Sequence, residues 1–547
     1  MRSLGILGSM RTNPNHRSAW LLLGAAASVY AAVIWWGRVP HRVAYDQLLY
    51  HSAAIAEFVQ QWPRPDLSDY LSATTPGLHL AMAWLTVTFS VGVVAHQLVC
   101  AVLTLVLIAT LLWFRPSRQA GPQIFDAIGG QYGWGMSRVG EVISVLPFVT
   151  SIYVFASAVW VLPDNAAWLG VLVMLLLSLA PTLSVQTVLF SGLTLTALVL
   201  TRQVHVWTAG PLLARCFLEG LRADGRPLLG AGWSPRPGLG RASVHASFAL
   251  LACLPAVLVL VYFYGIWGGL TPPTFQQQYH ATNLAGPAWM LSLLGFVSLF
   301  FIGYLLPGII EGWRRAKLLL VLGGIVGVIV SILPRTSAGL PSDYFAGRRT
   351  GLWDVAALVP ELGGYASPVI ILFAGIGGVV LTSLLMHLRL PQVGAVLSAF
   401  AGYSLALAAG GELWQRYGEP FILMMMVILL RFAGADRERL SSTYEKGGVV
   451  NWVWIPRIIS MAALGPLLLS AAFVALNVRD IRKPGSQLLT QPAPPAETAS
   501  ATVPNPRPDS PHSRYMISKG RLKPRANVQL QGAHEADGAT KQGDQPQ

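Results

Sequence analysis

HASFALLACLPAVLVLVYFYG, residues 245–265, contains no lysine, arginine, aspartate or glutamate. A helix of about 20 apolar residues crosses the hydrocarbon core of a bilayer. The run is continuous rather than alternating, so it predicts a membrane helix and not a barrel strand. Comparable runs recur from Ser18 to Ala475, and 53% of the 547 residues are hydrophobic while 11% are charged. The sequence therefore predicts a polytopic membrane protein and excludes a soluble multi-domain enzyme.

Working outward from this run, the fold class is predicted as all-α, a transmembrane helix bundle of about 12–14 spans. The stretch 202–214 is a candidate for a further half-helix. The predicted membrane segments are 19–36, 76–92, 94–113, 141–162, 166–182, 184–201, 245–265, 287–307, 317–333, 367–387, 391–409, 419–432 and 452–475. Together they form a predicted membrane domain over 19–477.

The distribution of arginine and lysine predicts the orientation of the chain. The first apolar segment follows several arginines and has no small-residue cleavage pattern, so it reads as a retained signal anchor with residues 1–18 in the cytoplasm. Basic stretches are expected inside, and they are 215–241, 313–317 and 431–446. The loops expected outside are 37–75, 266–286, 334–366 and 410–418. Simple counting places Arg115 and Arg118 outside, against their charge, so one earlier segment is predicted to be re-entrant or miscounted.

The formal net charge of +14 raises the possibility of a nucleic-acid partner. The lysines and arginines lie in short loops and in a polar tail, so we interpret them as topology signals and lipid-headgroup contacts and expect no nucleic acid. Cys100, Cys216 and Cys253 lack CxxC spacing, which indicates neither a disulfide framework nor a zinc site. Residues 478–547 are rich in Pro, Ser and Gln and are expected to be disordered.

The first outer loop carries the most informative polar residues. Asp46 and His51 precede the stretch 52–61, whose apolar residues have helical spacing and predict a short interfacial helix. Thr74 and Thr75 then start the next helix through a Thr-Thr-Pro-Gly sequence. Asp46 can act as a general base at the membrane surface, or it can cap the short helix, and the loop taken alone favours the cap.

Two further positions have both a functional and an ordinary interpretation. Asp164 follows Pro163 between two apolar segments, where it can bind substrate or cap the next helix. Arg202 ends a strongly apolar helix, where its guanidinium can bind a phosphate or anchor the helix at the membrane edge.

Later outer loops add amides, aromatic rings and charges, which suit a sugar-phosphate site and are also common interfacial anchors. They are 275–280, 343–345 with Arg348 and Arg349, and 412–420 with Arg416 and Tyr417. The sequence contains no phosphate-binding Gly-x-x-x-x-Gly-Lys-Ser/Thr loop and no His-Glu-x-x-His, which argues against an ATPase and a zinc protease.

Four of these stretches, in this order, resemble the dolichyl-phosphate-glucose alpha-1,2-glucosyltransferases of the GT-C superfamily, which add the terminal glucose to lipid-linked oligosaccharide. The stretches are Asp46-Gln47 with His51, Trp62 and Thr74-Thr75-Pro76-Gly77; Asp164-Asn165; Arg202-Gln203 with Trp207; and Gln415-Arg416-Tyr417 followed by Pro420. The chain departs from the family pattern at Gln47, where the family has an acidic residue, and at His205, which stands near the family's asparagine. We interpret the chain as a distant bacterial relative.

The resemblance implies a GT-C-like fold and an inverting transfer of a hexose, with glucose favoured, from a polyprenyl- or dolichyl-phosphate donor to a lipid-linked or cell-envelope glycan. It implies Asp46 as catalytic base, with His51 able to orient it. Phosphate ligands would be Arg202, Arg348, Arg349 and Arg416. Substrate-binding residues would be His51, Thr74, Thr75, Asp164, Gln203, His205, Trp207 and Tyr417.

No cofactor is expected, and a divalent ion at Asp46 is left open. The expected partners are the donor lipid, the glycan acceptor and the bilayer, with the site on the outer face of a bacterial inner membrane. Two other functions fit the same loops. A flippase or exporter of lipid-linked glycans would use the aromatic rings and arginines without a catalytic carboxylate. A related enzyme that builds cell-wall or protein-linked glycans would change only the acceptor.

Overall fold

The computed structural model describes residues 17–37, 46–116, 138–222, 228, 237–276, 282–336, 351–410, 413–444 and 455–482. Within these ranges the chain is almost entirely helical and forms no strand beyond an isolated bridge between Leu362 and Ala366. Eight of the described helices are long and apolar enough to cross a membrane, or nine when the bent pair α7 and α8 counts as one span. The prediction of a multi-pass, all-α protein is confirmed at this level.

The eight long helices are α1 (Arg17–Trp35), α5 (Val93–Trp113), α12 (Leu239–Trp267), α15 (Ile302–Ile332), α17 (Pro368–Leu385), α18 (Leu390–Ala409), α19 (Gln415–Tyr444) and α20 (Ile455–Ile481). The bent pair is α7 (Arg138–Thr150) with α8 (Ile152–Val159). Shorter apolar helices are α4 (Gly77–Phe89), α9 (Asp164–Ser178), α10 (Val185–Thr201) and α14 (Gly286–Phe300). The remaining elements are η3 (Gln47–His51), α3 (Ser52–Gln60), η4 (Gln203–Thr208), α11 (Ala209–Leu221), α13 (Pro273–Gln276) and α16 (Leu352–Ala357).

Each predicted membrane segment overlaps an observed helix, but the described residues contain eight or nine helices of spanning length against the 12–14 spans predicted. The segments 76–92, 166–182, 184–201 and 287–307 fall on the shorter helices α4, α9, α10 and α14, and several boundaries are wrong. The segment 141–162 is broken by a 66° bend at Ser151, whose hydroxyl accepts the Tyr153 N–H and caps α8. The segment 287–307 ends early, because the backbone leaves the helical region at Phe301. The basic stretch 215–241, expected as a loop, contains the end of α11 and the start of α12.

Both ends of the predicted membrane domain, 19 and 477, lie within the described residues, whereas most of the flanking segments do not. Helix α20 continues past the predicted boundary at 477 and ends at Ile481. Residues 1–16 and 483–547, which include most of the predicted cytoplasmic N-terminus and disordered tail, lie outside the described residues.

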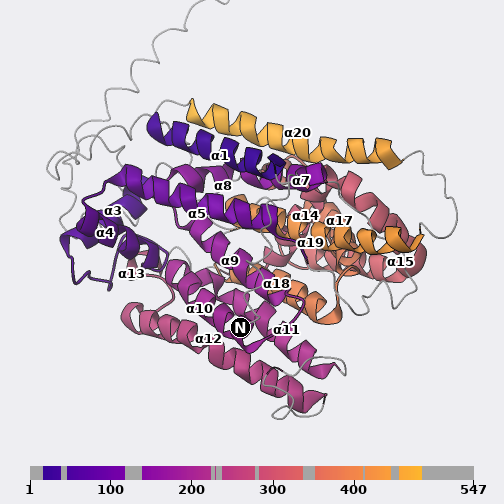
Figure 1. The fold of residues 1–547 in the computed structure, drawn as a ribbon, viewed down its shortest axis with the longest axis horizontal. Helices are drawn as coiled ribbons and strands as arrows, with labels where there is room; N and C mark the ends of the chain where they lie inside the picture. The colour runs from indigo at the N-terminus through magenta and orange to yellow at the C-terminus, as the bar shows by residue number, and fades with distance from the viewer. Residues whose placement is uncertain are drawn as a thin grey trace, which may run out of the picture. The chain divides into compact units, whose positions relative to one another are not determined.

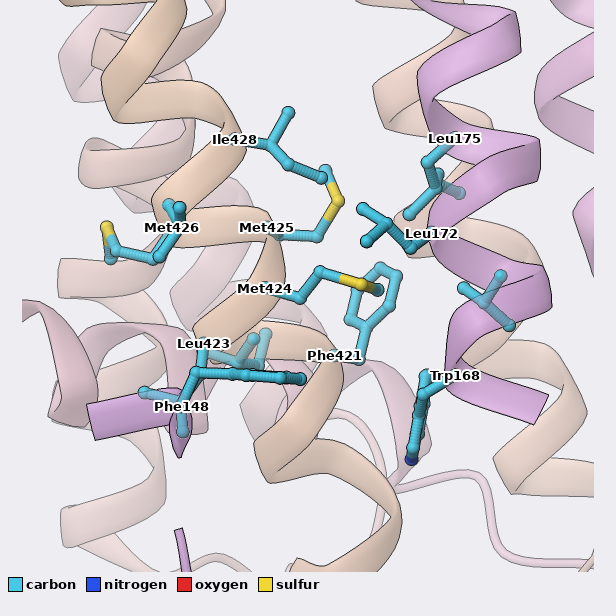
Figure 2. Packing of buried hydrophobic residues seen from close by; sticks show 14 of the residues in the cluster. Phe148, Trp168, Leu172, Leu175, Phe421, Leu423, Met424, Met425, Met426 and Ile428 are labelled. Atoms are coloured by element: carbon cyan, nitrogen blue, oxygen red, sulfur yellow. The ribbon is translucent and has the colours of Figure 1, made fainter. Parts of the chain in front are cut away.

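Helix α19 forms the centre of the bundle. In the apolar stretch of α19, 89% of the residues are buried, against 22% in that of α12. The outward face of α12 carries leucines and valines suited to lipid contact. The three consecutive methionines of α19 are fully buried, and Figure 2 shows Met424 and Met425 facing Leu172 and Leu175 of α9. Flexible thioethers fill irregular gaps between helices well. Helices α1 and α20 both pack on α7, along one side of this core (Figure 1).

The first long helices, α1 and α5, run between the same two ends of the bundle. Trp20 near the start of α1 packs on Trp113 at the end of α5, with ring centroids 4.6 Å apart, so these two points lie at the same end of the bundle. Helix α4 has 13 residues, too few to cross a bilayer. Within residues 17–37 and 46–116, α1 and α5 are thus the helices long and apolar enough to cross a membrane. The inside or outside placement of Arg115 stays a prediction.

Helix α17 packs unusually closely on its neighbours through glycines. A Cβ at Gly377 would lie 2.0 Å from the Leu291 carbonyl oxygen, and one at Gly295 would lie 1.9 Å from that of Phe373. Without a strong hydrophobic drive between helices in lipid, small residues at such contacts let backbones approach and pack.

We expect Gly377→Ala to destabilise the protein by roughly 1–3 kcal/mol, because a methyl group at this contact forces two backbones apart. The midpoint of thermal unfolding in detergent, followed by tryptophan fluorescence, measures the effect. Gly24→Ala is the matched control, since nothing lies within 4 Å of a Cβ at that helical position. Equal midpoints for the two variants would contradict the close contact.

Candidate functional site

The Asp46 carboxylate forms an ion pair instead of a helix cap. Its residue precedes η3 with helical dihedral angles, φ −62° and ψ −43°, and its side chain makes no capping hydrogen bond. Its Oδ2 accepts a hydrogen bond from Arg416 Nη1 at 2.5 Å. Arg416 stands at the start of α19, so this contact joins the first loop to the central helix. The cap interpretation of Asp46 is wrong in this structure.

Asp164 and Arg202 form a second ion pair of the same kind. Asp164 is the first residue of α9, where Pro163 holds the cap position, and no side-chain cap is formed. Arg202 ends α10 in an extended conformation, with φ −159° and ψ 105°. The break in the helix directs its guanidinium to Asp164, and the negative charge also suits the positive N-terminal end of α9.

Tyr417 lies between the two ion pairs. The guanidinium carbon of Arg202 is 5.2 Å from the centroid of its ring, and that of Arg416 is 4.9 Å. Arg416 Nη2 also donates to the Tyr417 hydroxyl at 3.1 Å. We call Asp46, Arg416, Tyr417, Arg202 and Asp164 the Tyr417 cluster. It carries two positive and two negative charges around one aromatic face.

The charged side chains of the Tyr417 cluster remain partly accessible. Their exposed fractions are 24% for Asp46, 33% for Arg416, 14% for Arg202 and 21% for Asp164. Carboxylates and guanidinium groups at such a position are screened less than on an open surface, and ligands can still reach them. A phosphate can therefore compete with each carboxylate for its arginine.

His51 lies beside this cluster in a largely dry environment. Burial, followed by the charges of Arg202 and Arg416, lowers its pKa to about 3. The imidazole is therefore neutral at physiological pH. Its Nδ1 is 2.8 Å from Nε2 of His79 in α4.

Gln203 and Thr75 tie loops together. The Gln203 amide donates to the carbonyls of Ala73 and Leu270, at 2.7 and 2.9 Å, and accepts the Thr75 N–H at 2.9 Å. The Thr75 hydroxyl donates to the Val199 carbonyl at 2.5 Å. Both amide hydrogens of Gln203 are therefore engaged with backbone. Its predicted contact with substrate and that of Thr75 stay predictions, while the structure gives both a role in holding the loop.

Thr74 belongs to the same turn. Its hydroxyl is 3.0 Å from that of Ser72, and its N–H donates to the Ser72 hydroxyl at 3.4 Å. Thr74 is buried, and neither of these hydrogen bonds involves a residue of the Tyr417 cluster.

His205 and Trp207 belong to an aromatic group with Trp168 and Tyr403. Trp207 Nε1 donates to Nδ1 of His205 at 3.3 Å, which leaves the hydrogen of the neutral ring on Nε2. That nitrogen is buried and has no hydrogen-bond partner in the described part of the chain. Burial and the charge of Arg202 hold the pKa of His205 well below its usual value. Tyr403 stacks on this group and donates its hydroxyl to the Tyr417 carbonyl.

The buried carboxylate of Glu419 holds the first turn of α19 in place through hydrogen bonds. Glu419 accepts hydrogen bonds from the hydroxyl of Ser151 and from Nε2 of Gln415, each at 2.6 Å. Gln415 in turn accepts the Leu352 N–H at 3.0 Å. The turn of helix that presents Arg416 is thus connected to the α7–α8 bend and to α16.

Sequence reasoning missed three residues of this region, which are His79, Trp168 and Tyr403. All three are nearly fully buried within apolar helices. In the sequence, a single polar or aromatic residue on such a helix cannot be distinguished from an ordinary core residue. Only the pairing of His79 with a residue of the preceding loop distinguishes it.

Two of the predicted phosphate ligands, Arg348 and Arg349, lie outside the described residues. Within the part of the chain that is described, no group of three or more His, Cys, Asp or Glu side chains is arranged to hold a metal ion. The expectation about metals stays a prediction.

Comparison with known proteins gives no relative for this chain. No protein-family model, curated protein or solved structure matches this chain. The resemblance to the glucosyltransferase family therefore stays a prediction.

Proposed function

We propose that this protein is a membrane glycosyltransferase that moves a hexose, with glucose favoured, from a polyprenyl-phosphate carrier to a lipid-linked or cell-envelope glycan. One observation carries the proposal. Stretches that resemble the GT-C glucosyltransferases, and that lie up to 370 residues apart, contribute Asp46, Asp164, Arg202, Arg416 and Tyr417 to a single cluster. A carboxylate base and paired phosphate ligands are the groups that this reaction requires.

The donor phosphate would exchange partners with the carboxylates. A guanidinium presents a planar fork of donors that matches two phosphate oxygens as well as it matches a carboxylate. When Arg416 turns to the phosphate, Asp46 loses its counter-charge. Its carboxylate then becomes a stronger base beside the reacting sugar.

The transfer step balances without a separate acid. The acceptor hydroxyl oxygen attacks the anomeric carbon, the bond from that carbon to the phosphate oxygen breaks, and the hydroxyl proton passes to Asp46. The bond electrons leave with the polyprenyl phosphate, whose growing charge Arg202 and Arg416 stabilise. Attack opposite to the leaving group inverts the anomeric configuration.

Tyr417 would keep the two arginines in place while their partners change. A cation over an aromatic face gains about 0.5–2 kcal/mol, an interaction that exchange of the anion does not remove. The aromatic surface also suits contact with the face of a sugar ring.

A site at the end of the helix bundle fits a substrate of mixed character. The isoprenoid chain can remain in the bilayer while its phosphate and sugar reach the loops. Arginine and lysine placement favours the outer face of a bacterial inner membrane for this end.

The proposal is tested with the purified full-length protein in detergent, given a polyprenyl-phosphate carrier with a radiolabelled hexose and a cell-envelope glycolipid extract. We expect the label to move to a larger glycolipid, and none to move when the extract is omitted. Detergent leaves no second compartment, so a flippase would give no product. Failure to transfer from any hexose donor across several acceptor extracts would overturn the proposal.

A further inference from the structure

The His51–His79 pair is an in-plane hydrogen bond. Its nitrogen atoms are 2.8 Å apart, the ring centroids are 5.1 Å apart and the ring planes differ by 14°. Two rings in face-to-face contact would lie closer. The centroid separation matches the N···N distance plus the distance from each ring centroid to its bonded nitrogen. The two nitrogens therefore lie on the line between the centroids, and the rings are nearly coplanar and joined edge to edge. This is good geometry for an N–H···N hydrogen bond.

This bond leaves one nitrogen of each ring without a protein partner among the described residues. Nδ1 of His79 is fully buried, whereas Nε2 of His51 is not. Tyr70 packs on His79, and Phe58 and Trp267 pack in turn on Tyr70. The His79 ring is nearly fully buried away from water. His51 therefore has a fixed, dry partner on one side and an accessible nitrogen on the other.

The bridging hydrogen can belong to either ring, and electrostatics decides between the two. Burial, Arg202 and Arg416 lower the pKa of His51, whereas burial and His51 lower that of His79, so the arginines lie on the side of His51 away from His79. If His79 donated, His51 would carry its hydrogen on Nε2, on that side. If His51 donates from Nδ1, its Nε2 carries a lone pair that these charges favour. The arginines therefore assign the bridging hydrogen to His51.

We propose that His79 is a positioning residue that holds His51 in the Nδ1–H tautomer, so that Nε2 of His51 presents a hydrogen-bond acceptor to a sugar hydroxyl at the Tyr417 cluster. The sugar as ligand rests on the proposed function, and the tautomer does not. An acceptor that a substrate hydroxyl covers on binding discriminates strongly against substrates that lack that hydroxyl. His51 then selects among sugars by the position of one hydroxyl, while Asp46 accepts the proton of another.

The groups facing His51 keep this acceptor constant with pH. Arg202 and Arg416 oppose its protonation, burial holds the pKa of His79 well below its usual value, and Tyr70 contacts the His79 ring in an edge arrangement. Because this imidazole does not titrate near neutral pH, its Nε2 can accept a hydrogen bond from a sugar hydroxyl throughout the physiological pH range.

The tautomer is tested by solid-state nitrogen NMR on the full-length protein with ¹⁵N-labelled histidine in phospholipid vesicles. The His51 signals are those lost in His51→Gln. We expect a protonated Nδ1 and an unprotonated Nε2 between about pH 5 and pH 8. His79→Leu should release His51 to a mixture of tautomers, and His79→Gln should keep the Nδ1–H form because its amide oxygen can accept the same bond. A protonated Nε2 in the unmodified protein overturns the inference.

Transfer kinetics provide the second readout. His79→Leu should raise KM for the sugar substrate roughly tenfold with little change in kcat, as expected when ground-state and transition-state binding are lost equally. His79→Gln should restore it. If kcat falls and Gln does not rescue, the effect of His79 is structural and the inference fails. If NMR gives the expected tautomer but no hexose is transferred, the proposed function fails while the positioning role of His79 stands.

Discussion

Asp46→Asn should reduce hexose transfer by roughly 10²–10⁴-fold, the usual contribution of a general base. Asparagine has nearly the same shape, and its amide oxygen can still accept the hydrogen bond from Arg416. It cannot accept the proton of the attacking hydroxyl. The protein should therefore fold normally and bind donor while the chemical step is lost. Initial rates with labelled polyprenyl-phosphate hexose measure the effect, together with the thermal unfolding midpoint.

Asp66→Asn is the matched control for this substitution. Asp66 belongs to the same loop, and its carboxylate accepts a local hydrogen bond from the Ser68 N–H at 2.9 Å, outside the Tyr417 cluster. This variant should keep its transfer rate. Full activity in a well-folded Asp46→Asn protein would rule out Asp46 as the base.

Arg202→Gln should lower transfer by roughly 10²–10³-fold, the effect of removing one group that stabilises charge in the transition state. It should also destabilise the protein by about 1–3 kcal/mol, because it leaves the Asp164 carboxylate in a partly buried position without its counter-charge. The double variant Arg202→Gln with Asp164→Asn separates the two effects. Two amides can bond to each other, so stability should return while transfer stays low.

The outcome is decided by comparing rate and unfolding midpoint for the three proteins. Recovery of both in the double variant would mean that Arg202 acts only as the partner of Asp164, and the phosphate-binding role would then be wrong.

The sequence predicts the helices of this protein well because each span is encoded locally. Bilayer thickness fixes the length of an apolar run, so segments such as 94–113 and 367–387 coincide closely with α5 and α17. The bend at Ser151 was not predicted, since it depends on a hydroxyl that caps α8 and also bonds to Glu419 in a distant helix.

The predicted site is only partly encoded in the same way. Asp46 and Arg416 are 370 positions apart, and no periodicity relates them, so the resemblance to a family brought them forward and the fold brings them together. Gln203 illustrates the limit of such reasoning. An amide after an apolar helix suits a sugar hydroxyl or a backbone carbonyl equally, and here the backbone engages both of its hydrogens.

The pairing of each arginine with its own carboxylate also bears on turnover. A lipid-linked sugar phosphate is a diester with one negative charge, while the polyprenyl phosphate left after transfer approaches two at neutral pH. If the proposed function holds, the spent carrier would on charge alone hold the arginines more tightly than fresh donor does, and transfer would stall on its own product. Asp164, and Asp46 once it has released its proton, are tethered competitors present at high effective concentration. By reclaiming Arg202 and Arg416 they would eject the spent carrier and reset the site for another cycle.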